Sequence, residues 1–196
     1  MRIDIMTDIE TLGTDSDSTI IQIAAVAFDI TTGKIHTWFN QTANIHKNEG
    51  PLKVTAGTLK WWMKTNPELL RELLDGEHSS EDMLRNFHDW LGQFKDEDMY
   101  LWGNGILFDN KMIQHQFESI GLNYPIFYRN DRDVRTILEL ASQKMNQPER
   151  TIRQFVTDMP RQKELVKHNA IDDCHYQIDL VRYCYNTLME GSEKNE

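Results

Sequence analysis

The sequence predicts an α/β fold in which one mixed β-sheet is covered by helices. Residues 19–29 form an almost continuous apolar run, which is typical of a central strand buried on both faces. Residues 29–33 supply turn chemistry, and residues 34–40 alternate Ile35, Thr37 and Phe39 against His36 and Trp38, which predicts a hairpin partner. With an apolar segment before them, these give three antiparallel strands, and later strands alternate with helical patterns.

Each remaining element follows from a local signal. The strands are expected at residues 2–7, 19–29, 34–40, 99–102 and 126–128, with a loop over residues 44–57. Helices are expected from Thr58, from Asn66-Pro67 with Asn66 as the N-cap, and from the Ser79-Ser80-Glu81-Asp82 start. Further helices should run from Phe108 to Gly121, from Val134 to about residue 146, and over residues 170–189, with residues 190–196 frayed.

Composition is that of a soluble globular chain, and 196 residues are expected to form a single domain, 1–196. The apolar runs are too short to span a membrane, so no membrane partner is expected. The N-terminus has no secretory pattern, which predicts a cytoplasmic protein. Cys174 and Cys184 fall ten residues apart in one predicted helix, about 15 Å along its axis, so packed free thiols are expected.

Charge is unevenly distributed. The net charge of −10 argues against a non-specific coat for long nucleic acid, which requires a basic surface. From residue 129 to 167, however, nine basic residues stand against six acidic ones, whereas residues 68–98 carry ten acidic and three basic residues. Such a chain can still hold a strand end if metal ions carry most of the phosphate binding.

Two carboxylates stand one residue apart in Asp8-Ile9-Glu10. In a strand both project to the same side, where they repel each other unless a cation lies between them. A divalent metal bound by both explains the pair, and so does a polar strand end entering a loop. This stretch alone leaves both explanations open.

Other candidate groups lie far along the chain. Asp109 follows a strand and the glycine-bracketed turn Gly103-Asn104-Gly105, where it is either a functional acid or a first-turn charge. His168 stands at the head of the last helix and is followed by Asp172 and Asp173, which individually fit a cap and favourable first-turn charges.

Together these segments resemble the motifs of the DEDD superfamily of 3′-to-5′ exonucleases in its histidine-containing (DEDDh) subgroup. The matching residues are Asp8-Ile9-Glu10-Thr11, Asn104, Phe108-Asp109 and His168-xxxx-Asp173, in order along the whole chain. The compact size and the Trp61-Trp62 helix are most similar to the small ribonuclease T-like and phage exodeoxyribonuclease-type enzymes. Gly103 departs from the histidine that many relatives carry, and Cys174 from a common alanine.

The resemblance implies a ribonuclease H-like sheet, with three antiparallel strands followed by parallel additions. It also implies that Asp8, Glu10 and Asp173 bind one Mg²⁺ or Mn²⁺, that Asp8 also binds a second ion, and that Asp109 supports it through water. His168 is the implied general base, a role that suits an imidazole near neutral pH. The implied reaction releases nucleoside 5′-monophosphates from single-stranded DNA or RNA 3′ ends.

The second carboxylate of the last motif has two candidates. On a regular helix Asp172 shares the face of His168, whereas the family motif selects Asp173. We favour Asp173, because His168 is expected to precede the helix, where helical periodicity does not apply.

Substrate contacts are expected at Thr11, Leu12, Trp61, Trp62 and Asn104. Trp61 and Trp62 either stack on nucleobases or pack in the core, and adjacent helical positions predict that at least one is core. The resemblance implies that Leu12 wedges between bases and that backbone amides near Thr11 and Leu12 touch the 3′ end. Asn104 either orients Asp109, contacts substrate or is a turn residue. Lys111, Arg132 and Arg135 are candidate phosphate contacts or simply solvated charges.

Two hypotheses about function follow. The first is a metal-dependent 3′-to-5′ exonuclease, and the second is a catalytically silent module of the same fold that binds nucleic-acid ends or a protein. Four converging acids favour the first. DNA and RNA differ at the 2′-hydroxyl, which no motif here reads, and a homodimer is compatible with the sequence.

Overall fold

Five strands form one mixed sheet in the computed structural model, which describes residues 1–190. The order is β3-β2-β1-β4-β5, with bounds β1 Arg2–Thr11, β2 Ile20–Phe28, β3 Ile35–Thr42, β4 Asp98–Gly103 and β5 Asp131–Asp133. β1, β2 and β3 pair antiparallel, whereas β4 lies parallel to β1 and β5 parallel to β4. Three antiparallel strands with two parallel additions are the predicted arrangement.

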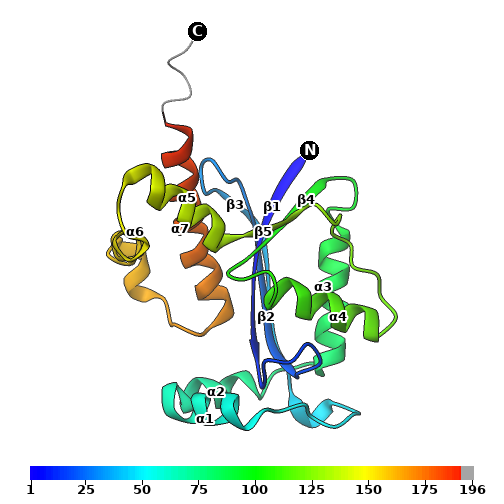
Figure 1. The fold of residues 1–196 in the computed structure, drawn as a ribbon. Helices are drawn as coiled ribbons and strands as arrows, with labels where there is room; N and C mark the ends of the chain where they lie inside the picture. Colours follow the sequence, from blue (N-terminus) through cyan, green and yellow to red (C-terminus); the bar gives the residue numbers. More distant parts are fainter. Residues whose placement is uncertain (191–196) are drawn as a thin grey trace.

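Helices cover both faces of this sheet (Figure 1). Their bounds are α1 Ala56–Thr65, α2 Pro67–Leu73, α3 Ser80–Gly92, α4 Asp109–Ser119, α5 Val134–Met145, α6 Glu149–Thr157 and α7 Ala170–Met189, with 3₁₀ turns at Ile45–Lys47 and Pro160–Glu164. α5, α6 and α7 lie on one face, α3 and α4 on the other, and α1 and α2 close the end of the sheet where β1 ends (Figure 1).

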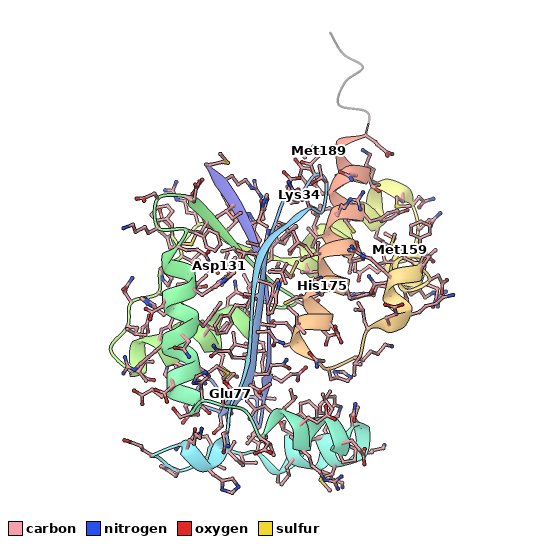
Figure 2. All side chains as sticks on the ribbon, turned by 180° about the vertical axis from the view of Figure 1, so that it is seen from behind. Lys34, Glu77, Asp131, Met159, His175 and Met189 are labelled. Carbon is pink, nitrogen blue, oxygen red and sulfur yellow. The ribbon has the colours of Figure 1, made fainter. Side chains whose placement is uncertain are left out.

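The alternation of β1 decides which residues face each helical layer. Ile5 and Ile9 belong to the apolar core beneath α3 and α4, whereas Met6 belongs to the core beneath α5 and α7. Side chains fill both spaces between sheet and helices (Figure 2). Asp8 and Glu10 are in phase with Met6, so both point toward α7, on one side of the sheet as predicted.

Several predicted helix ends are confirmed. Asn66 caps α2 by accepting from Leu69 N, and Ser79 caps α3 by accepting from Asp82 N. α5 ends at Asn146, which adopts the left-handed conformation with φ 53°. The last helix has the predicted bounds, and Cys174 and Cys184 are buried free thiols within it.

Other boundaries differ from the prediction. β1 continues to Thr11, and the predicted strand at residues 126–128 is wrong. Ile126 is instead a core residue of the loop, and the fifth strand is Asp131–Asp133. The sequence Asp131–Asp133 has no apolar residue that would predict a strand. Hydrogen bonds from Asn110 Nδ2 and the Tyr124 hydroxyl to Asp131 hold it in place instead.

Three further differences concern helices and the terminus. α1 begins at Ala56, two residues earlier than predicted, and α6 was not predicted at all. The only buried residues of α6 are Ile152 and Val156, which is a short signal for the helical period. Of the predicted frayed tail, residues 190–196, all but Glu190 lie outside the described residues. Among the described residues, no helix is long and apolar enough to cross a bilayer.

A third apolar cluster attaches α1 and α2 to the end of the sheet. Its members are Leu12, Ile21, Trp62, Leu69, Leu70 and Leu73. Trp62 is 1% exposed, and its indole Nε1 donates to the Thr11 carbonyl oxygen at 2.9 Å. This bond links α1 to the residue that follows Glu10.

We predict that Trp62→Phe lowers the stability of the protein, because it leaves the buried Thr11 carbonyl without this donor. The expected loss is about 1 to 3 kcal/mol, or roughly 3 to 10 °C in Tm for a chain of this size. Thermal denaturation measures it, with Trp61→Phe as the matched control, since Trp61 is 40% exposed. A Trp62→Phe protein as stable as wild type would contradict this account.

Candidate active site

β1 supplies two acids of the site. Glu10 is 9% exposed, and its Cα partner on β2 is Gln22, while Asp8 pairs with Ala24. The carboxylate of Asp8 accepts a 2.8 Å hydrogen bond from the Gln177 amide of α7. This bond joins the sheet to the helix that covers it.

Asp109 is brought to the same place by the turn after β4. It is the first residue of α4 and is 5% exposed, and the backbone N–H of Ile9 lowers its pKa against the effect of burial. Gly103 leaves room for it, because a Cβ there would lie 2.6 Å from Asn110 Oδ1 and 3.3 Å from Asp109 Oδ2. In this chain, a larger residue such as the family histidine would clash with Asn110 at this position.

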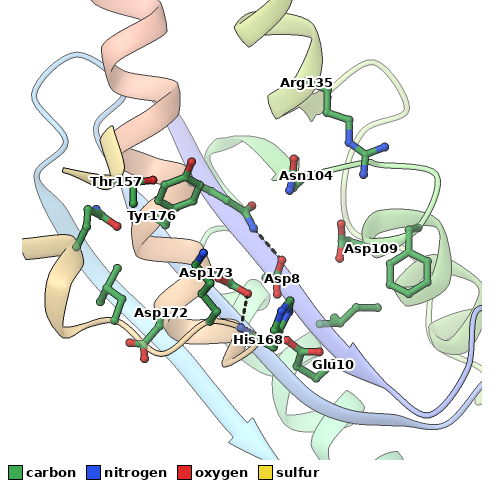
Figure 3. Close-up of a pocket in the computed structure, with 16 residues that line it drawn as sticks. Asp8, Glu10, Asn104, Asp109, Arg135, Thr157, His168, Asp172, Asp173 and Tyr176 are labelled. Atoms are coloured by element: carbon green, nitrogen blue, oxygen red, sulfur yellow. Dashed lines mark hydrogen bonds between the residues drawn. The ribbon is translucent and has the colours of Figure 1, made fainter. Parts of the chain in front are cut away.

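The N-terminus of α7 supplies the remaining groups. His168 precedes the helix, as expected, and has a left-handed backbone with φ 65°. Its backbone N–H donates to Asp173 Oδ2 at 3.1 Å, whereas Asp172 Oδ2 accepts from Val166 N. Figure 3 shows Asp173 turned toward Asp8 and Glu10, and Asp172 turned toward the preceding loop.

These residues line one cavity of about 460 Å³ (Figure 3). Its lining residues are Asp8, Ile9, Glu10, Asn104, Phe108, Asp109, Arg135, Thr157, Gln162, Leu165, Lys167, His168, Asp172, Asp173, Tyr176 and Gln177. The structure thus brings together all four predicted acids and the predicted histidine, from β1, α4 and the start of α7.

The donor set suits a hard divalent cation. Glu10, His168 and Asp173 each offer one ligand atom, and these atoms lie within 4.8 Å of one another. Carboxylate oxygens are the ligands preferred by Mg²⁺ and Mn²⁺. Asp8 and Asp109 line the same cavity, so the residues fit the predicted metal site.

The close packing of these buried acids raises their pKa values. Burial, with repulsion from Asp173 and Asp109, raises the pKa of Glu10 to about 9. Burial also raises the pKa of Asp109 to about 7, although N–H donors of Asp109 itself and of Ile9 oppose the rise. Desolvation and repulsion from Asp109, Glu10 and Asp173 raise the pKa of Asp8 well above its usual range. A cation would relieve this repulsion.

Two predicted substrate contacts are corrected by burial. The Leu12 side chain is 3% exposed within the cluster under α1, and its backbone N–H donates to Thr19 O, so neither is placed to touch a strand end. Trp62 is a core residue in the same cluster and is only 1% exposed, so little of its ring is available to a base, although it lines, with Thr11 and Trp61, a cavity beside Glu10. Thr11 is also buried, with its hydroxyl donating to Gly13 O.

Trp61 and Asn104 are better placed. Trp61 stands edge-on to the His168 ring, with centroids 4.8 Å apart, and lines a mainly apolar cavity of about 310 Å³. That cavity shares Ile9, Glu10 and Phe108 with the larger one. Asn104 lines the larger cavity, and its Oδ1 is buried and accepts no hydrogen bond from the described residues.

Of the three predicted phosphate contacts, one basic residue lines the cavity and two do not. Arg135 lines the larger cavity and lowers the pKa of Asp109 against the effect of burial, whereas Lys111 and Arg132 lie outside the lining. Arg132 instead donates to Arg129 O and stacks over Tyr100. Sequence reasoning missed Lys167 and Gln177, which line the cavity; their only signal was proximity to His168 and Asp173.

Comparison with known proteins agrees with this geometry. Residues 3–185 match the family model described as the 3′-5′ exoribonuclease Rv2179c-like domain. The chain belongs to this family. The enzyme class predicted from the sequence, a 3′-5′ exonuclease, is thereby confirmed.

A relative with a similar sequence points the same way. The exodeoxyribonuclease of Enterobacteria phage T4 is 23% identical over 216 residues, which cover 95% of this chain and 90% of that protein.

Solved structures show the shared fold. Cell-death related nuclease 4 (CRN-4) superposes with a TM-score of 0.66 at 18% identity, covering 94% of this chain. The nuclease domain of 3′hExo, a DEDDh family member bound to rAMP, gives 0.63 at 16% identity, with 97% of this chain and 94% of that domain covered. This chain spans 64% of the length of CRN-4. The predicted ribonuclease H-like fold and the DEDDh resemblance are confirmed.

We predict that Glu10→Gln stabilises the metal-free protein. Because the folded-state pKa of Glu10 is raised, the folded protein holds this proton more tightly than the unfolded chain, so stability is lost as pH rises toward about 9. Relief of even one pKa unit is about 1.4 kcal/mol, or roughly 3 to 6 °C in Tm.

Thermal denaturation in EDTA at pH 6 and pH 8 measures this effect. The Tm of Glu10→Gln should exceed that of wild type more at pH 8 than at pH 6, and the exposed acid Glu72, changed to Gln, serves as control. Equal differences at both pH values would count against the raised pKa.

Proposed function

We propose that the protein is a metal-dependent 3′-to-5′ exonuclease that removes nucleoside 5′-monophosphates from single-stranded DNA or RNA ends. One observation carries the proposal: Asp8, Glu10, Asp109, Asp173 and His168 converge on one cavity in a chain of a 3′-5′ exoribonuclease family. A module that only bound ends would gain nothing from acids that destabilise one another.

The metal part of the proposal rests on the acids. Asp8, Glu10, Asp109 and Asp173 would hold two Mg²⁺ or Mn²⁺ ions. Ions at such a site supply charge neutralisation for the phosphate and favour ionisation of the attacking water.

The chain's own residues perform the remaining steps. A ring nitrogen of His168 takes the proton of the water that attacks the terminal phosphorus. The bond from phosphorus to the 3′ oxygen of the preceding nucleotide breaks, and that oxygen takes a proton from solvent, which leaves a 5′-monophosphate and a shortened strand with a 3′-hydroxyl. Arg135 and Lys167 line the same cavity and provide positive charge for the phosphates on the 5′ side of the bond that is cut.

The smaller cavity is the proposed seat of the terminal nucleoside. It adjoins the acids through Glu10, and its apolar lining includes the half-exposed face of Trp61. Base stacking on such a ring contributes about 1 to 3 kcal/mol and tolerates any base. A single-stranded end can enter this cavity, whereas a paired base is already stacked within its duplex.

The direct test is degradation of 5′-labelled DNA and RNA oligonucleotides with Mg²⁺, Mn²⁺ or EDTA. We expect stepwise shortening from the 3′ end, released 5′-monophosphates and no reaction in EDTA. Stable end-binding without shortening of either polymer would replace the proposal with the silent module.

The two neighbouring aspartates give a matched pair of variants. Asp173→Asn should reduce kcat at least 100-fold, because Asp173 faces Glu10 and His168, whereas Asp172→Asn should stay within about threefold of wild type. A dead Asp172→Asn protein beside an active Asp173→Asn protein would reverse the assignment.

His168 can be tested separately from metal binding. His168→Gln should reduce kcat by about 10² to 10⁴-fold, the usual contribution of general acid–base catalysis. Oligonucleotide affinity, measured by fluorescence anisotropy in Ca²⁺, should change less than threefold. A His168→Gln enzyme with wild-type kcat would exclude the base role.

A further inference from the structure

Gln22 is the one polar residue of the otherwise apolar strand β2. All nine residues of β2 are buried, and Gln22 is 1% exposed. A buried amide is tolerated when its donors and acceptor are paired. The partners of Gln22 therefore show what this residue does in the fold.

The side chain of Gln22 reaches the start of α7. Its Oε1 accepts from the backbone N–H of Ala170 at 3.0 Å, and its Nε2 donates to Asn169 Oδ1 at 3.1 Å and to Asn40 Oδ1 at 3.0 Å. Both amide protons and the carbonyl oxygen are thus used. Ala170 is fully buried, so its N–H would have no solvent to replace Gln22.

Gln22, on the neighbouring strand β2, takes over the cap of this helix. Asn169 occupies the N-cap position of α7 but makes no side-chain cap hydrogen bond. Its carboxamide oxygen is instead held by Gln22, and the first helical N–H is satisfied by Gln22 as well. The start of α7 is therefore held by hydrogen bonds to β2 in addition to those within the helix.

The same residue stands beside the acids. Gln22 is the Cα partner of Glu10, and side chains of directly paired residues point to the same face of a sheet. His168 is two residues before Ala170, and its N–H is held by Asp173. A single side chain thus connects the strand position opposite Glu10 to the segment that carries His168.

We propose that Gln22 is a positioning residue that sets the placement of His168 and Asp173 on α7 relative to Asp8 and Glu10 on β1. The inference rests on the proposed exonuclease activity for its kinetic consequence. Displacement of a reacting group by about 1 Å can reduce the rate about 100-fold. Loss of the Gln22 hydrogen bonds therefore affects turnover more than binding, because Gln22 itself does not line the cavity.

The test compares Gln22→Met with Asn86→Ala. Methionine keeps the length of the side chain but has no donor or acceptor for these partners. Asn86 is the matched control, because its Nδ2 donates to Gln41 Oε1 at 3.1 Å, an amide pair that joins α3 to β3 without touching α7. Both proteins are assayed on the same labelled oligonucleotide well below their Tm, with kcat normalised to the folded fraction.

We expect Gln22→Met to lower kcat tenfold or more with KM within threefold, and Asn86→Ala to keep both values within threefold. Wild-type kcat in folded Gln22→Met would overturn the inference. If Gln22→Met does not fold, Asn169→Ala decides, since it removes only the 3.1 Å bond: kcat at least threefold lower supports the inference, and unchanged kcat overturns it.

A second readout does not depend on activity. Hydrogen–deuterium exchange of residues 165–175 should be at least tenfold faster in Gln22→Met than in wild type and Asn86→Ala. Equal exchange in all three would overturn the anchor itself. If wild type shows no nuclease activity, the proposed function fails, whereas this exchange experiment still tests Gln22.

Discussion

Burial and repulsion from Asp109 and Asp173 raise the pKa of Asp8 and Glu10, because β1, α4 and α7 hold these carboxylates in one cavity. No local propensity favours such an arrangement, and each acid would be more stable in water. The surrounding fold must therefore hold the three elements against this repulsion. Apolar clusters on both faces of the sheet supply most of the stabilisation, because they pack α4 and α7 against β1.

The parts of the fold that the sequence predicted are those with a strong periodic signal. The continuous apolar run of β2 is buried throughout, the alternation of β3 buries Phe39, and α7 buries eight of its residues. β5 and α6 were missed for the opposite reason. Two aspartates and an arginine make up β5, and hydrogen bonds to Asp131 from distant residues define it.

The residues of the candidate site also differ in how well the sequence predicted them. The order of the acidic motifs identified Asp8, Glu10, Asp109 and Asp173, because the proposed metal chemistry requires acids at those positions. The contacts of Leu12 and Trp62 could not be read in this way. Trp62 and Leu12 join one core cluster only because α1 folds back under the end of β1, a tertiary contact with no sequence signature. Gln177 likewise became visible only through its 2.8 Å bond to Asp8.

His168 shows how the fold places a strained residue at the centre of the site. A φ of 65° is uncommon for a residue other than glycine and costs on the order of 1 kcal/mol. The conformation is held from both sides, by Asp173 on the His168 N–H and by Gln22 on the two residues that follow. Glycine would adopt this backbone without strain but would carry no imidazole. The backbone of His168 is thus held by the helix start and, through Asn169 and Ala170, by the sheet.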